Sequence, residues 1–212
     1  MINKMNKLEN RSYNFEMRAD ESTDNVLVGT AVVFDKVTNL GCFDEVIDKR
    51  ALKDTDLTDV RFLVNHDTSK IPLARSRRNN GNSTMTLKVT QTGLDIKATL
   101  DVENNTEAQA LMSAVKRGDI SGMSFMFSVK EDEWDDVESN HPKRTIKAIE
   151  SIVEVSAVSF PAYKDAKIAQ ARDNLKVLEN ARQALENAKS RAVDTASLEL
   201  LKAKLKIRME DF

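Results

Sequence analysis

A histidine and a serine lie in two apolar segments of this chain, and together they are its clearest source of chemistry. His66 follows the run Phe62-Leu63-Val64, and Ser124 lies within the run 123–127. The chain has only two histidines, His66 and His141, so imidazole chemistry has almost no other source. A serine hydroxyl becomes a nucleophile when a nearby base removes its proton. The pair is therefore either a nucleophile with its general base or two structural positions in strands.

A serine–histidine pair needs a third group that orients the imidazole and compensates the charge it gains. Glu154 is one candidate with a physical reason, because it lies within an apolar strand segment, where an unpaired carboxylate is costly. Glu150, Asp67 and His141 are alternatives for this third role. Ser121 lies in the turn before the apolar run, and it is a rival nucleophile on chemical grounds alone.

Other kinds of site find little support in the sequence. The two histidines and the single cysteine, Cys42, are far apart and do not form a ligand set with zinc spacing. The acidic pairs at 132–133 and 135–136 lack the spacing of a calcium loop, and no glycine-rich phosphate loop is present. We therefore expect no metal and no cofactor. Cys42 has no cysteine partner within the chain and is interpreted as a buried or half-buried structural thiol.

The composition is typical of a soluble globular protein. Charged residues make up 31% of the 212 residues and hydrophobic residues 41%, with a net charge of -2. This balance gives no general attraction to nucleic acid or to anionic membranes. The basic run 75–78 is short and lacks interleaved aromatic residues, so it indicates a solvated turn or a substrate-contacting loop. No apolar run has membrane-spanning length, and the cytoplasm is the default location.

Residues before the last proline read as a strand-rich body. We expect a strand at 25–34 with a bulge at Gly29, a hairpin of 84–89 and 94–102, a helix at 106–117 that Gly118 ends, and strands at 123–130 and 146–160. The polar segment 131–144 is expected to be a loop. The predicted fold is α+β, with a β-barrel or a strongly curved, mostly antiparallel sheet and surrounding helices.

The rest of the chain has the composition of a helix. Residues 162–212 contain neither glycine nor proline, and apolar residues recur there at spacings of three and four. Residues 194–197 are the expected interruption, so one helix and two helices are both compatible with the pattern. The predicted domains are a body at 1–165 and a C-terminal helical tail at 166–212.

Six segments, in this order, resemble the prohead protease family of tailed phages, which are capsid-maturation serine peptidases. These segments are Gly29-Thr30-Ala31-Val32-Val33-Phe34, Phe43-Asp44-Glu45-Val46-Ile47, Leu63-Val64-Asn65-His66-Asp67 with Pro72-Leu73-Ala74-Arg75, Thr92-Gly93-Leu94, residues 117–127, and Glu154-Val155-Ser156-Ala157-Val158-Ser159-Phe160-Pro161-Ala162-Tyr163. The resemblance covers roughly residues 10 to 172.

The resemblance implies a fold similar to herpesvirus assemblin and a serine-type endopeptidase. His66 matches the family histidine and Ser124 the family serine, and Glu154 is our choice for the third catalytic residue. The family usually has Gly-Phe where this chain has Met126-Phe127, a less permissive backbone near the oxyanion site. Backbone amides are expected to stabilise the oxyanion, and Gly122 and the loop 75–77 are the candidate sources.

The resemblance also implies the partners. The expected substrates are the scaffolding protein or a scaffold-like segment of the major capsid protein, inside an immature procapsid in the host cytoplasm. The family also processes itself, so the tail is either a self-processed extension or a scaffold-docking element. The tail packing onto the body is a further alternative. Neither a membrane nor a specific nucleic acid is expected, and a homo-oligomer is included among the assemblies to be tested. The alternative function is a non-catalytic assembly protein with a protease-like fold.

Overall fold

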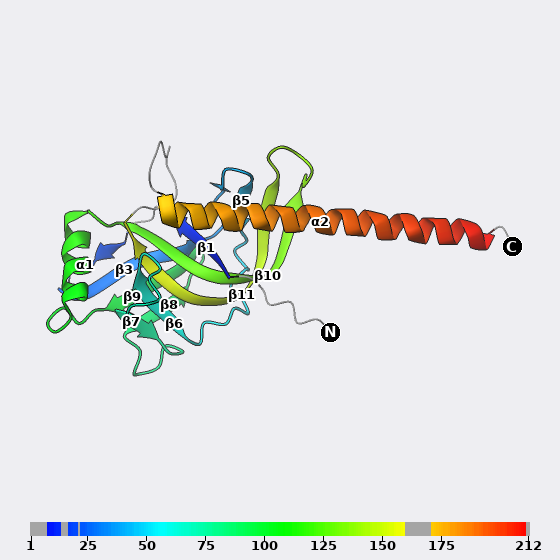
Figure 1. Ribbon diagram of the computed structural model, residues 1–212. Coiled ribbons are helices and arrows are strands. Elements are labelled where there is room, and N and C mark those ends of the chain that lie inside the picture. Colours follow the sequence, from blue (N-terminus) through cyan, green and yellow to red (C-terminus); the bar gives the residue numbers. More distant parts are fainter. Residues whose placement is uncertain (1–7, 14–16, 21, 160–170, 211–212) are drawn as a thin grey trace.

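The computed structural model describes residues 8–13, 17–20, 22–159 and 171–210. Its two sheets and two helices form an elongated molecule in which a strand-rich body carries one long C-terminal helix (Figure 1). The larger sheet has seven strands, β1 (Leu8–Tyr13), β10 (Gly122–Asp135), β11 (Lys143–Val158), β5 (Asp44–Ile47), β4 (Thr38–Asn39), β6 (Val60–Val64) and β7 (Ala74–Ser76). The smaller sheet has four, in the order β2 (Arg18–Ala19), β3 (Val26–Val33), β9 (Gly93–Thr99) and β8 (Met85–Val89).

The α+β class with a mostly β body is therefore confirmed, but the barrel is not. The strands within the described ranges form two open sheets rather than a closed barrel. Most strand pairs are antiparallel, whereas β5 and β6 both pair with β11 in parallel. The predicted boundary between body and tail, at 165/166, and the motif residues 160–163 lie outside the described residues.

The two sheets share one apolar core, in which β3 of the smaller sheet faces β10 of the larger. Leu27 and Val32 pack there with Phe125 and Phe127, and all four side chains are fully buried. Gly29 permits a close approach of the sheets, because a Cβ at this position would lie 2.6 Å from the sulfur of Met123. The bulge predicted at Gly29 is instead a register shift between Thr30 and Val32. This packing fixes the strand that carries Ser124.

The longest hairpin joins β10 and β11, and it corrects the prediction of a loop at 131–144. β10 continues to Asp135 and β11 begins at Lys143, so the connection between them is much shorter than expected. Polar residues are tolerated in this part of the hairpin because they are paired across it. Arg144 donates to Asp132 at 2.9 Å, and Lys147 lies 2.9 Å from Glu133.

The helix α1 (Thr106–Arg117) forms where the sequence predicts it. The Asn105 side chain accepts from the amides of Glu107 and Ala108, which caps the first turn. Gly118 ends the helix in the left-handed conformation, with φ of 79°. The buried residues of α1, including Leu111 and Val115, join the main core. The predicted hairpin is likewise present as β8 and β9.

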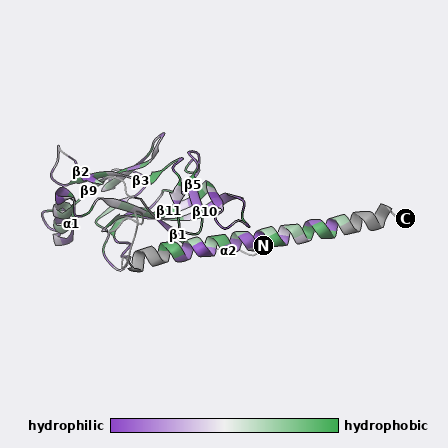
Figure 2. Ribbon diagram, turned by 90° about the horizontal axis from the view of Figure 1, so that it is seen from above, coloured by the Kyte–Doolittle hydropathy of each residue, from purple (hydrophilic) through white to green (hydrophobic). Residues whose placement is uncertain are grey.

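The C-terminal helix α2 (Ala171–Glu210) is continuous, so the interruption expected at 194–197 is absent. Thr195 donates its hydroxyl to the carbonyl of Arg191 one turn earlier, which satisfies this polar side chain inside the helix. The first part of α2 packs on the body, where Val177 and Ala181 bury Leu40 and Phe43. The remainder runs past the body, and hydrophilic and hydrophobic residues are interspersed along its coloured part (Figure 2).

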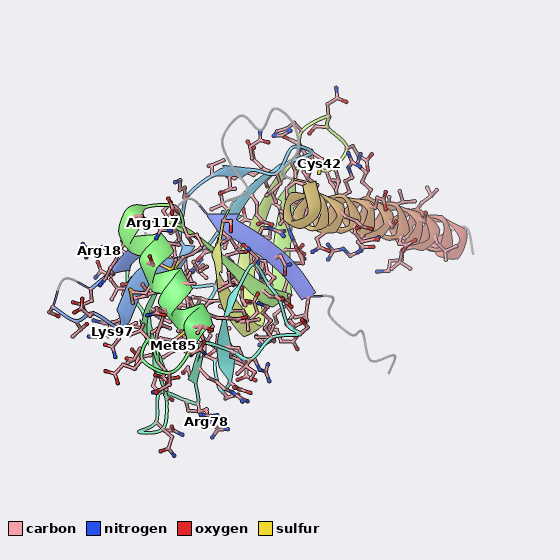
Figure 3. The ribbon with its side chains drawn as sticks, turned by 60° about the vertical axis from the view of Figure 1, so that its left-hand side comes forward. Arg18, Cys42, Arg78, Met85, Lys97 and Arg117 are labelled. Atoms are coloured by element: carbon pink, nitrogen blue, oxygen red, sulfur yellow. The ribbon has the colours of Figure 1, made fainter. Side chains whose placement is uncertain are left out.

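Cys42 and the basic run lie at opposite ends of the body. Cys42 is half-buried beside α2, whereas Arg78 lies on the far side of the molecule (Figure 3). Burial raises the pKa of the Cys42 thiol, which suits a structural cysteine. Arg75 makes two hydrogen bonds of 2.6 Å with the carboxylate of Asp59, so this member of the basic run is committed to an ion pair within the body.

A buried network of charges links β1 to β5 and β11 of the large sheet. Arg11 is fully buried and donates to Glu45 at 2.5 and 2.7 Å and to Glu9 at 2.6 Å. Arg144 donates to Glu9 at 2.8 and 3.0 Å and to Glu45 at 3.1 Å. Although burial alone would raise the pKa of Glu9, Arg11 and Arg144 lower it from 4.5 to about 2. Arg191 extends the network, because it donates to Asp132 from the middle of α2.

The depressed pKa of Glu9 predicts a specific acid sensitivity. The ionised carboxylate contributes stability that is complete above pH 4.5 and is lost as the pH falls towards 2, at most about 3 kcal/mol. Urea unfolding from pH 6 to pH 2.5 measures this loss. Glu9→Gln is expected to be less stable at pH 6 and to have a flatter pH dependence. The exposed Glu103→Gln is the matched control and should keep the wild-type slope; equal slopes in all three proteins would contradict the prediction.

Candidate active site

His66 lies in a tight turn immediately after β6. Asn65 and His66 both have left-handed backbone conformations, with φ of 51° and 57°. This conformation is tolerated by asparagine but is uncommon for histidine, so the turn must be held by its surroundings. The amide of Asp67 donates to the carbonyl of Val64 at 3.1 Å, which closes the turn. The chain thus reverses at the point where the imidazole leaves the sheet.

Hydrogen bonds to β11 and to the residue after it hold this turn in place. The Asn65 amide donates to the carbonyl of Ala157 at 2.9 Å, and the His66 amide donates to the hydroxyl of Ser156 at 3.2 Å. The Asn65 side chain accepts from the amide of Ser159 at 3.0 Å and donates to its hydroxyl at 3.2 Å. Because β6 itself pairs with β11, the histidine is fixed relative to the strand that carries Glu154.

The side chains of Ser124, His66 and Glu154 form one hydrogen-bonded line. Ser124 Oγ lies 2.6 Å from Nε2 of His66, and Nδ1 of His66 lies 2.5 Å from Oε1 of Glu154. Ser124 and Glu154 come from the neighbouring strands β10 and β11, and His66 reaches across from β6. The three residues selected from the sequence are therefore in direct contact. This geometry matches the order of nucleophile, base and orienting carboxylate.

The hydrogen-bonding partners of His66 determine which of its two ring nitrogens carries a proton. A carboxylate only accepts, so Nδ1 of His66 must carry a proton and donate it to Glu154. In the neutral imidazole Nε2 is then unprotonated and is able to accept the proton of Ser124. Glu154 is held from its other side by Ser156, whose hydroxyl donates to Oε2 at 2.5 Å. Its carboxylate is 2% exposed and has both oxygens occupied, which fixes its orientation.

Ser124 is fully buried and has a second partner from β1. Its hydroxyl also lies in donor geometry to the carbonyl oxygen of Arg11, at 2.9 Å. A hydroxyl has one proton, so this carbonyl and Nε2 of His66 compete for it while both contacts exist. The side chain of His66 is 6% exposed. Both side chains are therefore shielded from solvent.

The alternative residues do not enter this arrangement. Ser121 is exposed in the turn before β10, and its carbonyl accepts from the amide of Met17. Asp67 accepts from Ser69 in its own turn, at 2.5 and 3.1 Å. Glu150 accepts from Ser128 at 3.3 Å, and His141 contacts Asp44 at 2.9 Å at the other end of β11. The imidazole of His66 contacts Ser124 and Glu154 rather than any of these residues.

Three residues that hold the site had no role in the sequence predictions. Ser156 could have been found, because it is two residues after Glu154 and so faces the same side of its strand. Asn65 gives no signal of its own in the sequence, because its anchoring bonds depend on a contact with Ser159, 94 residues away. The carbonyl of Arg11 gives no sequence signal, since it is a backbone group. Gly122 and the loop 75–77 stay predictions as oxyanion donors.

Within residues 8–13, 17–20, 22–159 and 171–210, no group of three histidine, cysteine or acidic side chains is placed to hold a metal ion. In the same ranges no helix is long and apolar enough to cross a membrane.

A mostly β body that carries a hydrogen-bonded serine, histidine and carboxylate has the arrangement of a serine hydrolase. Comparison with protein families gives the narrower class. The family described as caudovirus prohead serine protease matches residues 13–181, which include all three residues of the line. The chain belongs to this family, and its class of activity is phage capsid maturation by a serine peptidase. No curated protein and no solved structure matched the chain.

Proposed function

We propose that the chain is the serine endopeptidase that processes the scaffolding protein, or a scaffolding segment of the major capsid protein, inside the immature procapsid. Ser124 is the nucleophile, His66 the general base and Glu154 the orienting carboxylate. The observation that carries the proposal is the continuous contact from Ser124 Oγ through both nitrogens of His66 to Glu154, at 2.6 and 2.5 Å. Family membership supports the same reaction class.

Acylation begins when His66 Nε2 takes the proton of Ser124 while Oγ attacks the carbonyl carbon of the scissile peptide bond. The imidazolium that forms keeps its Nδ1 proton on Glu154, whose negative charge stabilises it. Nε2 then donates its proton to the leaving nitrogen, and the C–N bond breaks. The products of this half-reaction are a free amine and an ester on Ser124.

Deacylation repeats these proton transfers with water. A water molecule loses a proton to Nε2 and attacks the ester carbonyl, and Ser124 regains its proton as the acid product leaves. Acylation needs the competing carbonyl of Arg11 to give up the Ser124 hydroxyl, so rearrangement around β1 accompanies substrate entry. Backbone amides supply the oxyanion donors in this proposal.

Co-expression with the capsid and scaffolding proteins of the same phage tests the function. Intact-mass analysis of the capsid protein, or of the scaffold, is expected to show one defined truncation in the presence of the wild-type chain. The chain itself is expected to be trimmed under the same conditions. Full-length capsid and scaffold proteins in assembled procapsids would contradict the proposal and favour the alternative, a non-catalytic assembly protein.

The distal part of α2 supports a second element of the proposal, docking to scaffold helices. Val193, Leu198, Leu200 and Leu201 are 52–60% exposed beyond the contacts with the body. An exposed apolar stripe with mixed charge suits association with another helix. By contrast, Val177 and Ala181 are buried against Leu40 and Phe43, so the start of α2 belongs structurally to the body.

This division predicts different results for two truncations. Deletion of residues 194–212 is expected to keep the melting temperature within a few degrees and to keep peptide cleavage, but to reduce incorporation into procapsids at least tenfold. Deletion of residues 173–212 is expected to destabilise the body as well, by several kcal/mol, because Leu40 and Phe43 become exposed. Thermal unfolding and quantitative blotting of purified procapsids provide the measurements. Normal incorporation of the shorter truncation would refute docking through the distal part.

A further inference from the structure

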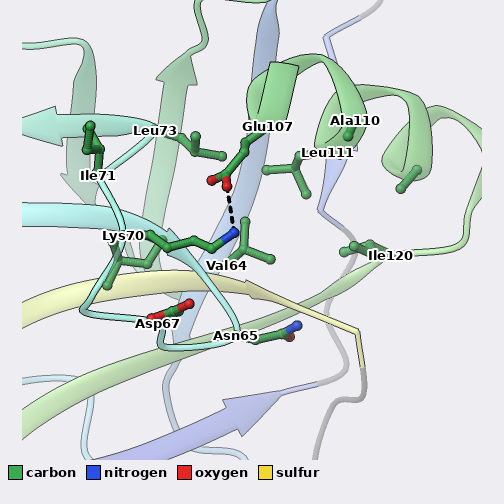
Figure 4. A pocket seen from close by; sticks show the side chains of 12 residues that line it. Val64, Asn65, Asp67, Lys70, Ile71, Leu73, Glu107, Ala110, Leu111 and Ile120 are labelled. Carbon is green, nitrogen blue, oxygen red and sulfur yellow. Dashed lines mark hydrogen bonds and ion pairs between the residues drawn. The ribbon is translucent and has the colours of Figure 1, made fainter. Parts of the chain in front are cut away.

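An open pocket adjoins the segments that carry His66 and Ser124. It has a volume of about 410 Å³, and Figure 4 shows it between α1 and the turn of His66. Asn65 and Asp67, the residues on either side of His66, form part of its wall. Ile120, four residues before Ser124 and just before β10, forms another part. The pocket therefore borders both segments that carry catalytic residues, although Ser124, His66 and Glu154 themselves do not line it.

The lining of the pocket is mainly apolar. Leu63 and Leu111 are both buried, and Leu111 also belongs to the main core. Leu73, Ile120 and Ala110 complete the apolar wall. At the rim Ile71 is 82% exposed, the highest value among the exposed large apolar residues that the structure describes. Filling an open apolar pocket with an apolar group is favourable, because it removes apolar surface of both partners from water.

The charged residues that line the pocket are one cation, Lys70, and two carboxylates, Glu107 and Asp67. Nζ of Lys70 donates to Glu107 at 2.5 Å, and this ion pair joins the loop after His66 to the first turn of α1 (Figure 4). Both side chains are about half-exposed, at 55% and 49%. With this cation paired and a second carboxylate in the wall, the pocket disfavours an acidic side chain. Asp67 already accepts from Ser69 at 2.5 and 3.1 Å, and the apolar walls disfavour a polar occupant. The preferred occupant is therefore uncharged and apolar.

We propose that this pocket binds an aliphatic or aromatic side chain of the substrate, close to the scissile bond, and so contributes to cleavage specificity. The proposal rests on the proposed function, because it takes the peptide to be attacked at Ser124. The volume of the pocket lies within the range of about 300–1,000 Å³ that is usual for ligand sites. This is enough for one large side chain and its neighbouring backbone. The substrate side chain that fills the pocket is thus leucine-like or phenylalanine-like.

Cleavage profiling of a peptide library tests the specificity. Wild-type protein is expected to select Leu, Ile, Met or Phe at one fixed position near the cleaved bond. Ala110→Phe, which fills the pocket from α1, is expected to reduce cleavage of such peptides on the order of 10-fold or more and to shift that position towards small residues. Gln109→Phe is the matched control, because Gln109 is exposed on the same helix outside the pocket, and its profile should equal wild type. An unchanged profile in Ala110→Phe would overturn the proposal.

A binding measurement separates this proposal from the proposed function. In methyl-labelled full-length Ser124→Ala, N-acetyl-leucine amide is expected to shift the methyl signals of Leu111 and Ile120, whereas N-acetyl-lysine amide is not. Equal shifts with both probes, or none with either, would overturn the pocket assignment even in a protein that cleaves normally. If the shifts are selective but the wild-type protein fails to cleave, the pocket assignment is kept and the proposed peptidase function is rejected.

Discussion

Replacing Ser124 with alanine is expected to lower the rate of substrate cleavage by at least about 10⁴-fold, to the level of residual catalysis without a nucleophile. The variant keeps the strand, the buried position and the histidine–glutamate contact, but it has no oxygen to attack the peptide carbonyl. The measurement is the initial rate of cleavage of purified scaffold or capsid protein. Circular dichroism and thermal unfolding confirm that the fold is retained.

Ser121→Ala is the matched control for this prediction. Ser121 precedes Ser124 by three residues and is exposed, so its loss removes a hydroxyl from the same segment without touching the imidazole. Its rate is expected to remain within about threefold of wild type, as for a surface substitution of small effect. Loss of activity in Ser121→Ala with normal activity in Ser124→Ala would reverse the assignment of the nucleophile.

Replacing Glu154 with glutamine is expected to reduce the rate by about 10²- to 10⁴-fold while the protein remains folded. A neutral amide cannot stabilise the imidazolium, and its NH₂ group, if turned towards Nδ1, favours the tautomer in which Nε2 carries the proton. In the wild-type protein Ser156 donates to the second carboxylate oxygen at 2.5 Å, so Ser156 will influence the orientation of the glutamine amide in the variant. The loss should appear in kcat rather than in KM, because Glu154 acts through His66.

Glu150→Gln is the control for this second prediction. Glu150 lies on the same strand and was an alternative third residue, but its carboxylate accepts from Ser128, away from the imidazole. Its activity is expected to stay close to wild type. Full activity in Glu154→Gln would remove Glu154 from the site, and an equal loss in Glu150→Gln would mean that the effect is structural.

Local signals in the sequence were enough for the elements with clear ends. Asn105 and Gly118 bracket α1, and the turn at 92–93 separates β8 from β9, because capping and turn chemistry depend on a few neighbouring residues. The catalytic residues were also accessible. The chain offers only two histidines, and the cost of burying Glu154 marked it as a residue that needs a partner.

Features that depend on distant partners were not predictable in this way. The hairpin extends through Asp132 because Arg144 and Arg191 compensate its charge, and the sequence does not indicate that these residues meet. The two-sheet arrangement depends on parallel pairing of β5 and β6 with β11, which a pattern of strands does not specify. Placement of Arg11 beside Glu45 required a strand at 8–13 that the sequence analysis did not identify.

The most direct test of the catalytic assignment is to map a fluorophosphonate adduct in a preparation that is actively cleaving its substrate. We predict one adduct, on the peptide that contains Ser124, whose formation parallels the loss of proteolysis and slows strongly in His66→Ala. An adduct on Ser121 or another residue, or proteolysis that persists after Ser124 is fully modified, would contradict the assignment of Ser124 as the nucleophile.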